Sequence, residues 1–152
     1  MKIEFNSKNL EKNYDKIVVR KFLDIKDSFK NPNIKGNPIL YKVFIKDYGN
    51  FEHGLTIINP GCINKEFFMT KGHKHKNPVE EIYIPLSGKG KLLLQGKPSK
   101  VLELKKNKIY IIPKKTAHRL INTGNKKLVV FTIYSKDAGH DYNFKFTKRF
   151  LK

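Results

Sequence analysis

The feature that most constrains this chain is a succession of short apolar runs, rich in β-branched and aromatic residues and separated by turn signals. The runs are Ile39 to Ile45, Leu55 to Ile58, Phe67 to Thr70, Glu81 to Leu86, Lys91 to Leu94, Val101 to Leu104, Ile109 to Ile112, His118 to Ile121 and Leu128 to Tyr134. Turn residues lie between them, as in Asn59-Pro60-Gly61 and Thr123-Gly124-Asn125. Many short strands at near-regular spacing are typical of an all-β sandwich or barrel.

The organisation along the chain predicts a single domain. A chain of 152 residues is of the size that forms one domain. Residues 1–36, which end in a Pro/Asn/Gly hinge at Lys30 to Gly36, are expected to form a short irregular N-terminal arm with one or two helical turns, packed on a barrel formed by residues 37–152.

The charge is the most unusual bulk property. There are 32 Lys and Arg against 13 Asp and Glu, which gives a net charge of +19. The lysines are scattered, however, and arginine occurs only at Arg20, Arg119 and Arg149, whereas base readout and phosphate forks favour Arg. The pattern therefore does not favour specific nucleic-acid binding, although a positive field would attract an anionic small substrate.

Cysteine content and hydropathy bear on location. Cys62 is the single cysteine, so it cannot form an intrachain disulfide. No apolar run approaches the roughly 20 residues of a membrane span, and no charged and then apolar leader opens the chain. We therefore expect a cytoplasmic protein with no membrane partner.

The strongest chemical signal is Gly72-His73-Lys74-His75, followed by Glu81 and, far downstream, by His118. Alternate side chains of a strand share a face, so His73 and His75 can point together into a barrel. Glu80 and Glu81 must face opposite ways, and we choose Glu81 because it shares parity with Tyr83.

Three imidazoles and one carboxylate suit one divalent transition metal, namely Fe(II), Mn(II), Ni(II), Co(II) or Zn(II), with coordination positions left for water or substrate. A strand histidine such as His118, taken alone, is more often structural. The argument for a metal site depends on the four residues occurring together.

This arrangement resembles the cupin family. The first cupin motif is matched by His73, His75, Glu81 and Gly88. The second motif is matched by Pro113, His118 and Asn122. Its two glycine positions are occupied by Asn107 and Lys115. The resemblance implies a cupin-type double-stranded β-helix, also called a jelly-roll barrel.

A narrower resemblance covers residues 37 to 142. The chain is similar there to the archaeal-type cupin glucose-6-phosphate isomerases, through segments such as Thr70-Lys71-Gly72-His73 and Asp137-Ala138-Gly139-His140-Asp141-Tyr142. The resemblance implies interconversion of glucose 6-phosphate and fructose 6-phosphate in glycolysis and gluconeogenesis, in the cytoplasm, by a homodimer with a divalent metal, commonly iron.

The resemblance also implies roles for individual residues. It makes His73, His75, Glu81 and His118 the metal ligands. Glu81 and His140 are the implied catalytic residues, with Glu81 either moving a proton as a base or only holding the cation while hydride shifts. The implied substrate-binding residues are Tyr41, Thr56, Thr70, Gly72, Tyr83, Tyr134, His140 and Tyr142.

One departure from the family pattern keeps alternatives open. Lys115 stands where these isomerases tend to carry an aromatic residue near the mouth of the site, which could alter sugar preference or pair with the phosphate. The alternatives are another metal-dependent cupin enzyme (a different sugar-phosphate isomerase or epimerase, or an oxygenase), a non-catalytic sugar-sensing cupin, and a nucleic-acid binder that rests only on the charge.

Overall fold

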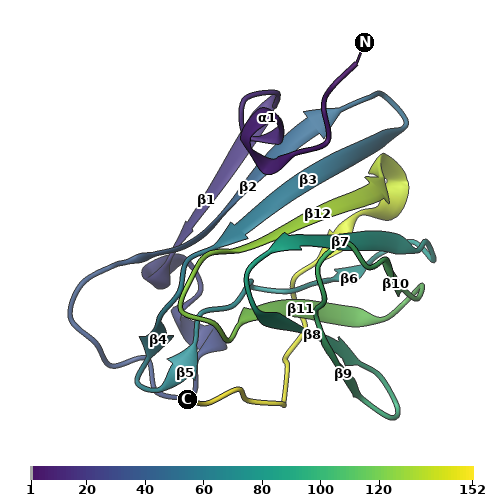
Figure 1. Ribbon diagram of the computed structural model, residues 1–152. Helices are drawn as coiled ribbons and strands as arrows, with labels where there is room; N and C mark the ends of the chain where they lie inside the picture. The colour runs from purple at the N-terminus through teal and green to yellow at the C-terminus, as the bar shows by residue number, and fades with distance from the viewer. Residues whose placement is uncertain (1) are drawn as a thin grey trace.

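The computed structural model describes residues 2–152, and its framework is two facing sheets of antiparallel strands (Figure 1). The larger sheet has, in spatial order, β1 (Lys16–Lys21), β2 (Ile39–Asp47), β3 (Phe51–Ile58), β12 (Leu128–Ser135), β7 (Glu81–Ser87) and β10 (Tyr110–Ile112). The smaller sheet has β11 (Ala117–Asn122), β8 (Gly90–Gln95) and β9 (Lys100–Glu103). The predicted all-β fold is confirmed.

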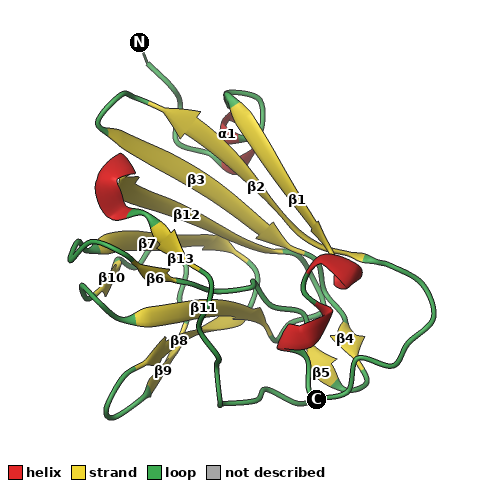
Figure 2. Ribbon diagram, turned by 180° about the vertical axis from the view of Figure 1, so that it is seen from behind, coloured by secondary structure: helices red, strands yellow, loops and turns green. Residues whose placement is uncertain are grey.

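Two short strand pairs and a few helical turns complete the fold. β13 (His140–Asp141) pairs with β6 (Lys74–His75), and β4 (Cys62–Ile63) pairs with β5 (Glu66–Phe67). Figure 2 shows the helical turns in red, and they are α1 (Ser7–Leu10) and the 3₁₀ turns η1 (Phe22–Asp24), η2 (Lys26–Ser28) and η3 (Lys136–Ala138). Within residues 2–152, no helix is long and apolar enough to cross a membrane.

The alternation of side chains along the strands separates two apolar clusters. The main core lies between the sheets and contains fully buried residues such as Leu40, Ile58 and Ile121. A second cluster lies on the other face of the large sheet, where Leu10 of α1 packs with Phe44 and Leu55. Both faces of the large sheet are therefore partly covered, which fits the apolar character of its strands.

Residues 2–36 differ from the expected irregular arm. Residues Lys16–Lys21 form β1, which pairs antiparallel with β2 over its whole length and adds an edge to the large sheet. The prediction missed this strand because its apolar residues Ile17 and Val19 are half-exposed and lie between charged residues. The boundary between residues 36 and 37 stays a prediction.

Candidate metal centre and substrate cavity

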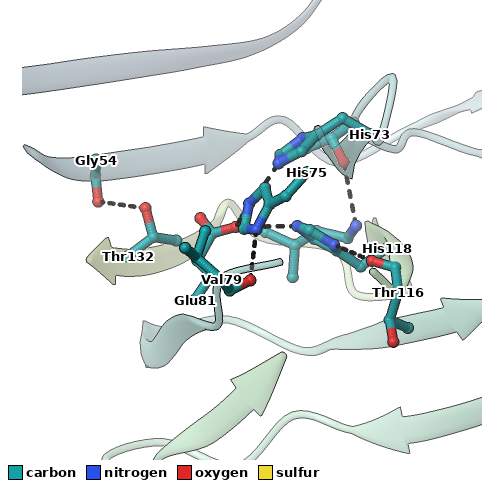
Figure 3. Close-up of polar contacts among 10 residues, drawn as sticks. Gly54, His73, His75, Val79, Glu81, Thr116, His118 and Thr132 are labelled. Carbon is teal, nitrogen blue, oxygen red and sulfur yellow. Dashed lines mark hydrogen bonds and ion pairs between the residues drawn. The ribbon is translucent and has the colours of Figure 1, made fainter. Parts of the chain in front are cut away.

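The four predicted metal ligands come from three separate parts of the chain and meet between the sheets. His75 lies in β6, Glu81 begins β7, and His118 lies in β11. His73 precedes β6 and forms an isolated bridge with His118. One ligand atom from each residue lies within 4.8 Å of the others, and Figure 3 shows the side chains turned toward one another.

The three imidazoles surround one oxygen of Glu81. Its Oε2 atom lies 3.0 Å from Nε2 of His118, 3.1 Å from Nε2 of His75 and 3.6 Å from Nε2 of His73. Glu81 is buried, whereas Glu80 is exposed. The choice of Glu81 over Glu80 therefore agrees with the burial of the two side chains.

Backbone carbonyls set the tautomer of two of these histidines. The Nδ1 atom of His75 lies 3.0 Å from the carbonyl oxygen of Val79, and Nδ1 of His118 lies 2.9 Å from that of Thr116 (Figure 3). A carbonyl oxygen only accepts, so each Nδ1 carries the proton and donates it. Each Nε2 is then the atom that faces Glu81, and it donates a hydrogen bond to the carboxylate when the ring is protonated or offers a lone pair to a metal when the ring is neutral.

Neutral imidazole nitrogens and a carboxylate repel one another unless a proton or a metal cation lies among them. In addition, Nε2 of His73 is buried and makes no hydrogen bond within residues 2–152. The donor set of three nitrogens and one carboxylate oxygen suits a divalent transition metal. The residues present therefore fit a metal ion.

The ionisation states agree with a ligand role. Burial raises the pKa of Glu81, but contacts with the three imidazoles outweigh it and hold the pKa well below its usual value. Burial lowers the pKa of His73 to about 4 and also lowers that of His140. At neutral pH Glu81 is thus a carboxylate, and His73 is a neutral imidazole able to bind a metal.

A cavity of about 390 Å³ opens beside this cluster and is lined by Glu81, His73 and His118. All eight residues implied as substrate-binding line it as well, namely Tyr41, Thr56, Thr70, Gly72, Tyr83, Tyr134, His140 and Tyr142. They come from β2, β3, β7 and β12 of the large sheet, from the segment before β6, and from β13 and the residue after it. The eight residues thus surround one cavity. Their individual roles stay predictions.

Gly72 owes its place to close packing. Its φ is +74°, and an added Cβ atom would lie 2.6 Å from the ring of Phe146 and 2.8 Å from the carbonyl oxygen of His118. Only glycine adopts this conformation without strain and fits this space. The backbone of Gly72 therefore runs directly beside the predicted metal ligands His73 and His118.

The two replaced cupin glycines keep the backbone shape of glycine. Asn107 has φ of 60° and Lys115 has φ of 58°, both in the left-handed region. Asn tolerates this conformation, but Lys does so at a cost. Lys115 is exposed and does not line the cavity. Its suggested influence on sugar preference is therefore not supported by a position in the cavity wall.

Several residues of the cavity wall were not predicted from the sequence. The polar ones include Arg20 of β1, Glu52 of β3 and Thr132 of β12. The alternation of Lys16, Val18 and Arg20 with Ile17 and Val19 is the signal that could have placed Arg20 on the inner face. Nothing in the sequence around Glu52 marks it as a cavity residue.

Comparison with known proteins connects this site to a family. The family model of glucose-6-phosphate isomerase matches residues 43–149, which include the four clustered ligands and most of the cavity. The chain belongs to the glucose-6-phosphate isomerase family. The glucose-6-phosphate isomerase of Thermococcus litoralis is 36% identical over 147 residues, covering 88% of this chain and 77% of the relative. That of Pyrococcus horikoshii is 33% identical over 165 residues, covering 100% of this chain and 86% of the relative.

Solved structures identify the fold of this glucose-6-phosphate isomerase family member. An oxalate decarboxylase of Bacillus subtilis with Mn(II) centres superimposes with a TM-score of 0.54 at 22% identity, covering 64% of this chain and 26% of that chain. A Lactobacillus farciminis oxalate decarboxylase gives the same TM-score at 20% identity, covering 67% of this chain and 30% of the other. The predicted cupin jelly-roll fold is confirmed.

Proposed function

We propose that this chain is a metal-dependent aldose-ketose isomerase that interconverts glucose 6-phosphate and fructose 6-phosphate. The observation that carries the proposal is the meeting of a three-histidine, one-carboxylate cluster with a cavity lined by all eight implied substrate residues. The relatives named glucose-6-phosphate isomerase support the choice of substrate.

The proposed cofactor is one divalent transition metal per subunit, held by His73, His75, Glu81 and His118. Fe(II) is the first candidate, and Mn(II), Ni(II), Co(II) and Zn(II) suit the same donors. When bound, such an ion supplies Lewis acidity toward the sugar oxygens at C1 and C2. The neutral state of His73 and the ionised state of Glu81 support this assignment.

Glu81 is the proposed group that manages a proton between C1 and C2. All three of its imidazole contacts are to Oε2, and within residues 2–152 no hydrogen bond is made to Oε1. Glu81 lines the cavity, so Oε1 can face a bound sugar while Oε2 stays among the histidines. A direct hydride shift, with Glu81 acting only as a ligand, is the competing route.

His140 is the proposed acid-base group for opening the sugar ring. Its ring lies 4.3 Å from that of His73 and 5.7 Å from that of Tyr134, measured between ring centroids. Burial lowers its pKa, so at neutral pH it is uncharged and can accept a proton. Tyr142, whose ring lies 5.8 Å from that of His140, covers the same end of the cavity.

The phosphate is proposed to bind Thr56, Thr70, Tyr41 and the backbone of Gly72. The hydroxyl of Tyr41 accepts a hydrogen bond from the Lys71 amide at 3.2 Å, and Thr70 Oγ1 accepts one from the Leu120 amide at 3.1 Å. Each hydroxyl proton is then free to point at another acceptor, such as a phosphate oxygen. Tyr83 and Tyr134 orient the sugar in this proposal.

The proposal places the reaction in the cytoplasm, in glycolysis and gluconeogenesis, and makes the enzyme a homodimer. Support for a dimer comes from the outer face of the large sheet. Ile111 of β10 pairs with Ile82 of β7, which pairs with Ile133 of β12. Ile111 and Ile82 are 62% and 36% exposed, so an apolar row faces outward. Light scattering on the purified protein tests the dimer.

The deciding experiment measures conversion of fructose 6-phosphate to glucose 6-phosphate. The protein is stripped with a chelator and then supplied with Fe(II), Mn(II) or Zn(II), with His118→Ala treated in parallel. Activity that returns with metal in the parent alone supports the proposal. Bound metal without turnover would overturn it in favour of another metal-dependent cupin enzyme, such as an oxygenase or an isomerase of a different sugar phosphate.

A further inference from the structure

Strand β1 brings an arginine into the cavity wall. Lys16, Val18 and Arg20 line the cavity, whereas the alternate residues Ile17 and Val19 are 39% and 36% exposed on the other side. This is the ordinary two-residue alternation of a strand. Arg20 stands directly across from Tyr41 in the β1-β2 register.

Arg20 and two of the cavity's carboxylates lie near opposite ends of β1. The carboxylates of Asp15 and Asp47 lie at one end, where Asp15 accepts a hydrogen bond from the Asp47 amide at 2.9 Å. Asp15 directly precedes β1, and Arg20 lies five residues beyond it, a span of about 16 Å at roughly 3.3 Å per residue. Within residues 2–152, no carboxylate forms an ion pair with Arg20.

The surroundings of Arg20 are donors and phenols. Burial raises the pKa of Tyr41 and of Tyr142, and the positive charge of Arg20 acts on both in the opposite direction. Arg20 stands across from Tyr41 in the strand register, and both line the cavity together with Tyr142. Tyr41 in turn contacts the Lys71 amide, next to Gly72. The Lys71 amide donates to the Tyr41 hydroxyl oxygen, which leaves the Tyr41 hydroxyl proton and the Arg20 guanidinium to donate to another acceptor in this part of the cavity.

We propose that Arg20 is the residue that neutralises the substrate phosphate, and that the phosphate lies between Arg20 on β1 and the Thr70 to Gly72 segment. The inference rests on the proposed function and deepens it. A buried phosphate dianion needs a cation as well as neutral donors, and a guanidinium offers a bidentate fork that matches phosphate oxygens. Lys71 is a weaker candidate because its Nζ lies over the ring of Tyr142, 5.0 Å from the centroid, and it does not line the cavity.

Binding of sorbitol 6-phosphate tests this inference. This compound carries the phosphate but has no carbonyl, so it cannot be isomerised and its affinity is read without turnover. Titration calorimetry on the metal-loaded protein compares the parent with Arg20→Gln, Arg20→Lys and Lys42→Gln. Lys42→Gln is the matched control because it makes the same charge change on the neighbouring strand, at an exposed position facing away from the cavity.

The expected result is a loss of affinity of about 10- to 100-fold for Arg20→Gln, the range for a charged hydrogen-bonding group. Arg20→Lys should lose less, since it keeps the charge but not the fork. Lys42→Gln should bind as the parent does. Metal content and the melting temperature of each variant confirm that the fold is intact. If Arg20→Gln fails to fold, Arg20→Lys carries the test.

Two outcomes separate the failures. If the parent binds sorbitol 6-phosphate and isomerises fructose 6-phosphate, but Arg20→Gln binds as tightly as the parent, the role of Arg20 is wrong and the proposed function stands. If the parent neither binds sorbitol 6-phosphate nor isomerises fructose 6-phosphate, the proposed function fails and the assignment of Arg20 fails with it.

Discussion

His73 and His118 are joined by a reciprocal pair of backbone hydrogen bonds. The His118 amide donates to the His73 carbonyl at 2.9 Å, and the His73 amide donates to the His118 carbonyl at 3.2 Å. Two side chains of the candidate metal centre, far apart in the chain, are therefore positioned by main-chain pairing. Because the two backbones are paired, the short imidazole side chains are enough to bring both Nε2 atoms to Glu81.

His118→Ala should abolish metal binding and activity together, because it removes a buried ligand from a four-ligand set. His140→Ala is the matched control. Its ring packs on His73, but it is outside that set, so the variant should keep its metal and lose activity. Elemental analysis of the purified proteins measures the metal. Full metal occupancy in His118→Ala would show that the ligand assignment is wrong.

Glu81→Gln should weaken metal binding by more than about tenfold, since outer-shell partners alone are worth about 10- to 100-fold and this change removes a charged ligand. Glu80→Gln should be nearly silent, because Glu80 is exposed while Glu81 is buried. Metal titration in competition with a chelator compares the two. Equal losses would mean that the strand register around β7 is misassigned.

Lys115→Gly should stabilise the fold by about 0.5 to 1 kcal/mol. Its φ is 58°, and left-handed backbone costs a non-glycine residue about 1–2 kcal/mol. Glycine also has more conformational freedom in the unfolded chain, which offsets about 0.4–1 kcal/mol of this gain in stability. Urea unfolding measures the difference. Lys114→Gly is the control, and it should destabilise because Lys114 has no positive φ to relieve. A destabilised Lys115→Gly would mean that the lysine side chain contributes contacts.

His53 should make the protein less stable as the pH falls below about 6.5, the usual histidine pKa. His53 is 4% exposed on the outer face of the large sheet, where its Nδ1 lies 3.0 Å from the hydroxyl of Tyr48. Burial lowers its pKa, the charge of Lys46 lowers it further, and Asp15 opposes this weakly. Between the folded and unfolded pKa values the unfolded chain binds more protons, so the free energy of unfolding decreases toward acid.

The His53→Phe variant should lose that part of the acid dependence. Urea unfolding from pH 7 to pH 5, with chelator present in both proteins, should give a slope smaller than the parent's by at most about 1.4 kcal/mol per pH unit, the value for one proton. The remaining histidines titrate in both proteins and cancel in the comparison. Identical slopes would mean that His53 becomes protonated as readily in the folded protein as in the unfolded chain.

Much of the site was predictable because its residues follow local rules. Strand alternation placed His73 and His75 together and separated Glu81 from Glu80, and the positions of these residues agree with that reasoning. The short apolar runs and their turns likewise predicted the strands of both sheets except β1. These features depend on the two-residue period of a strand, which a sequence displays directly.

The tertiary structure alone decided which strands close over the cavity. Arg20 lies on an edge strand whose outer residues Ile17 and Val19 are half-exposed, so its apolar pattern is weak and the segment was expected to be irregular. Glu52 reaches the cavity only because β3 pairs with β12 opposite Tyr134. The sequence by itself determined the fold class and the candidate ligands, because these follow from local periodicity and motif spacing. The wall of the cavity depends on pairing between strands distant in the chain, which local patterns do not encode.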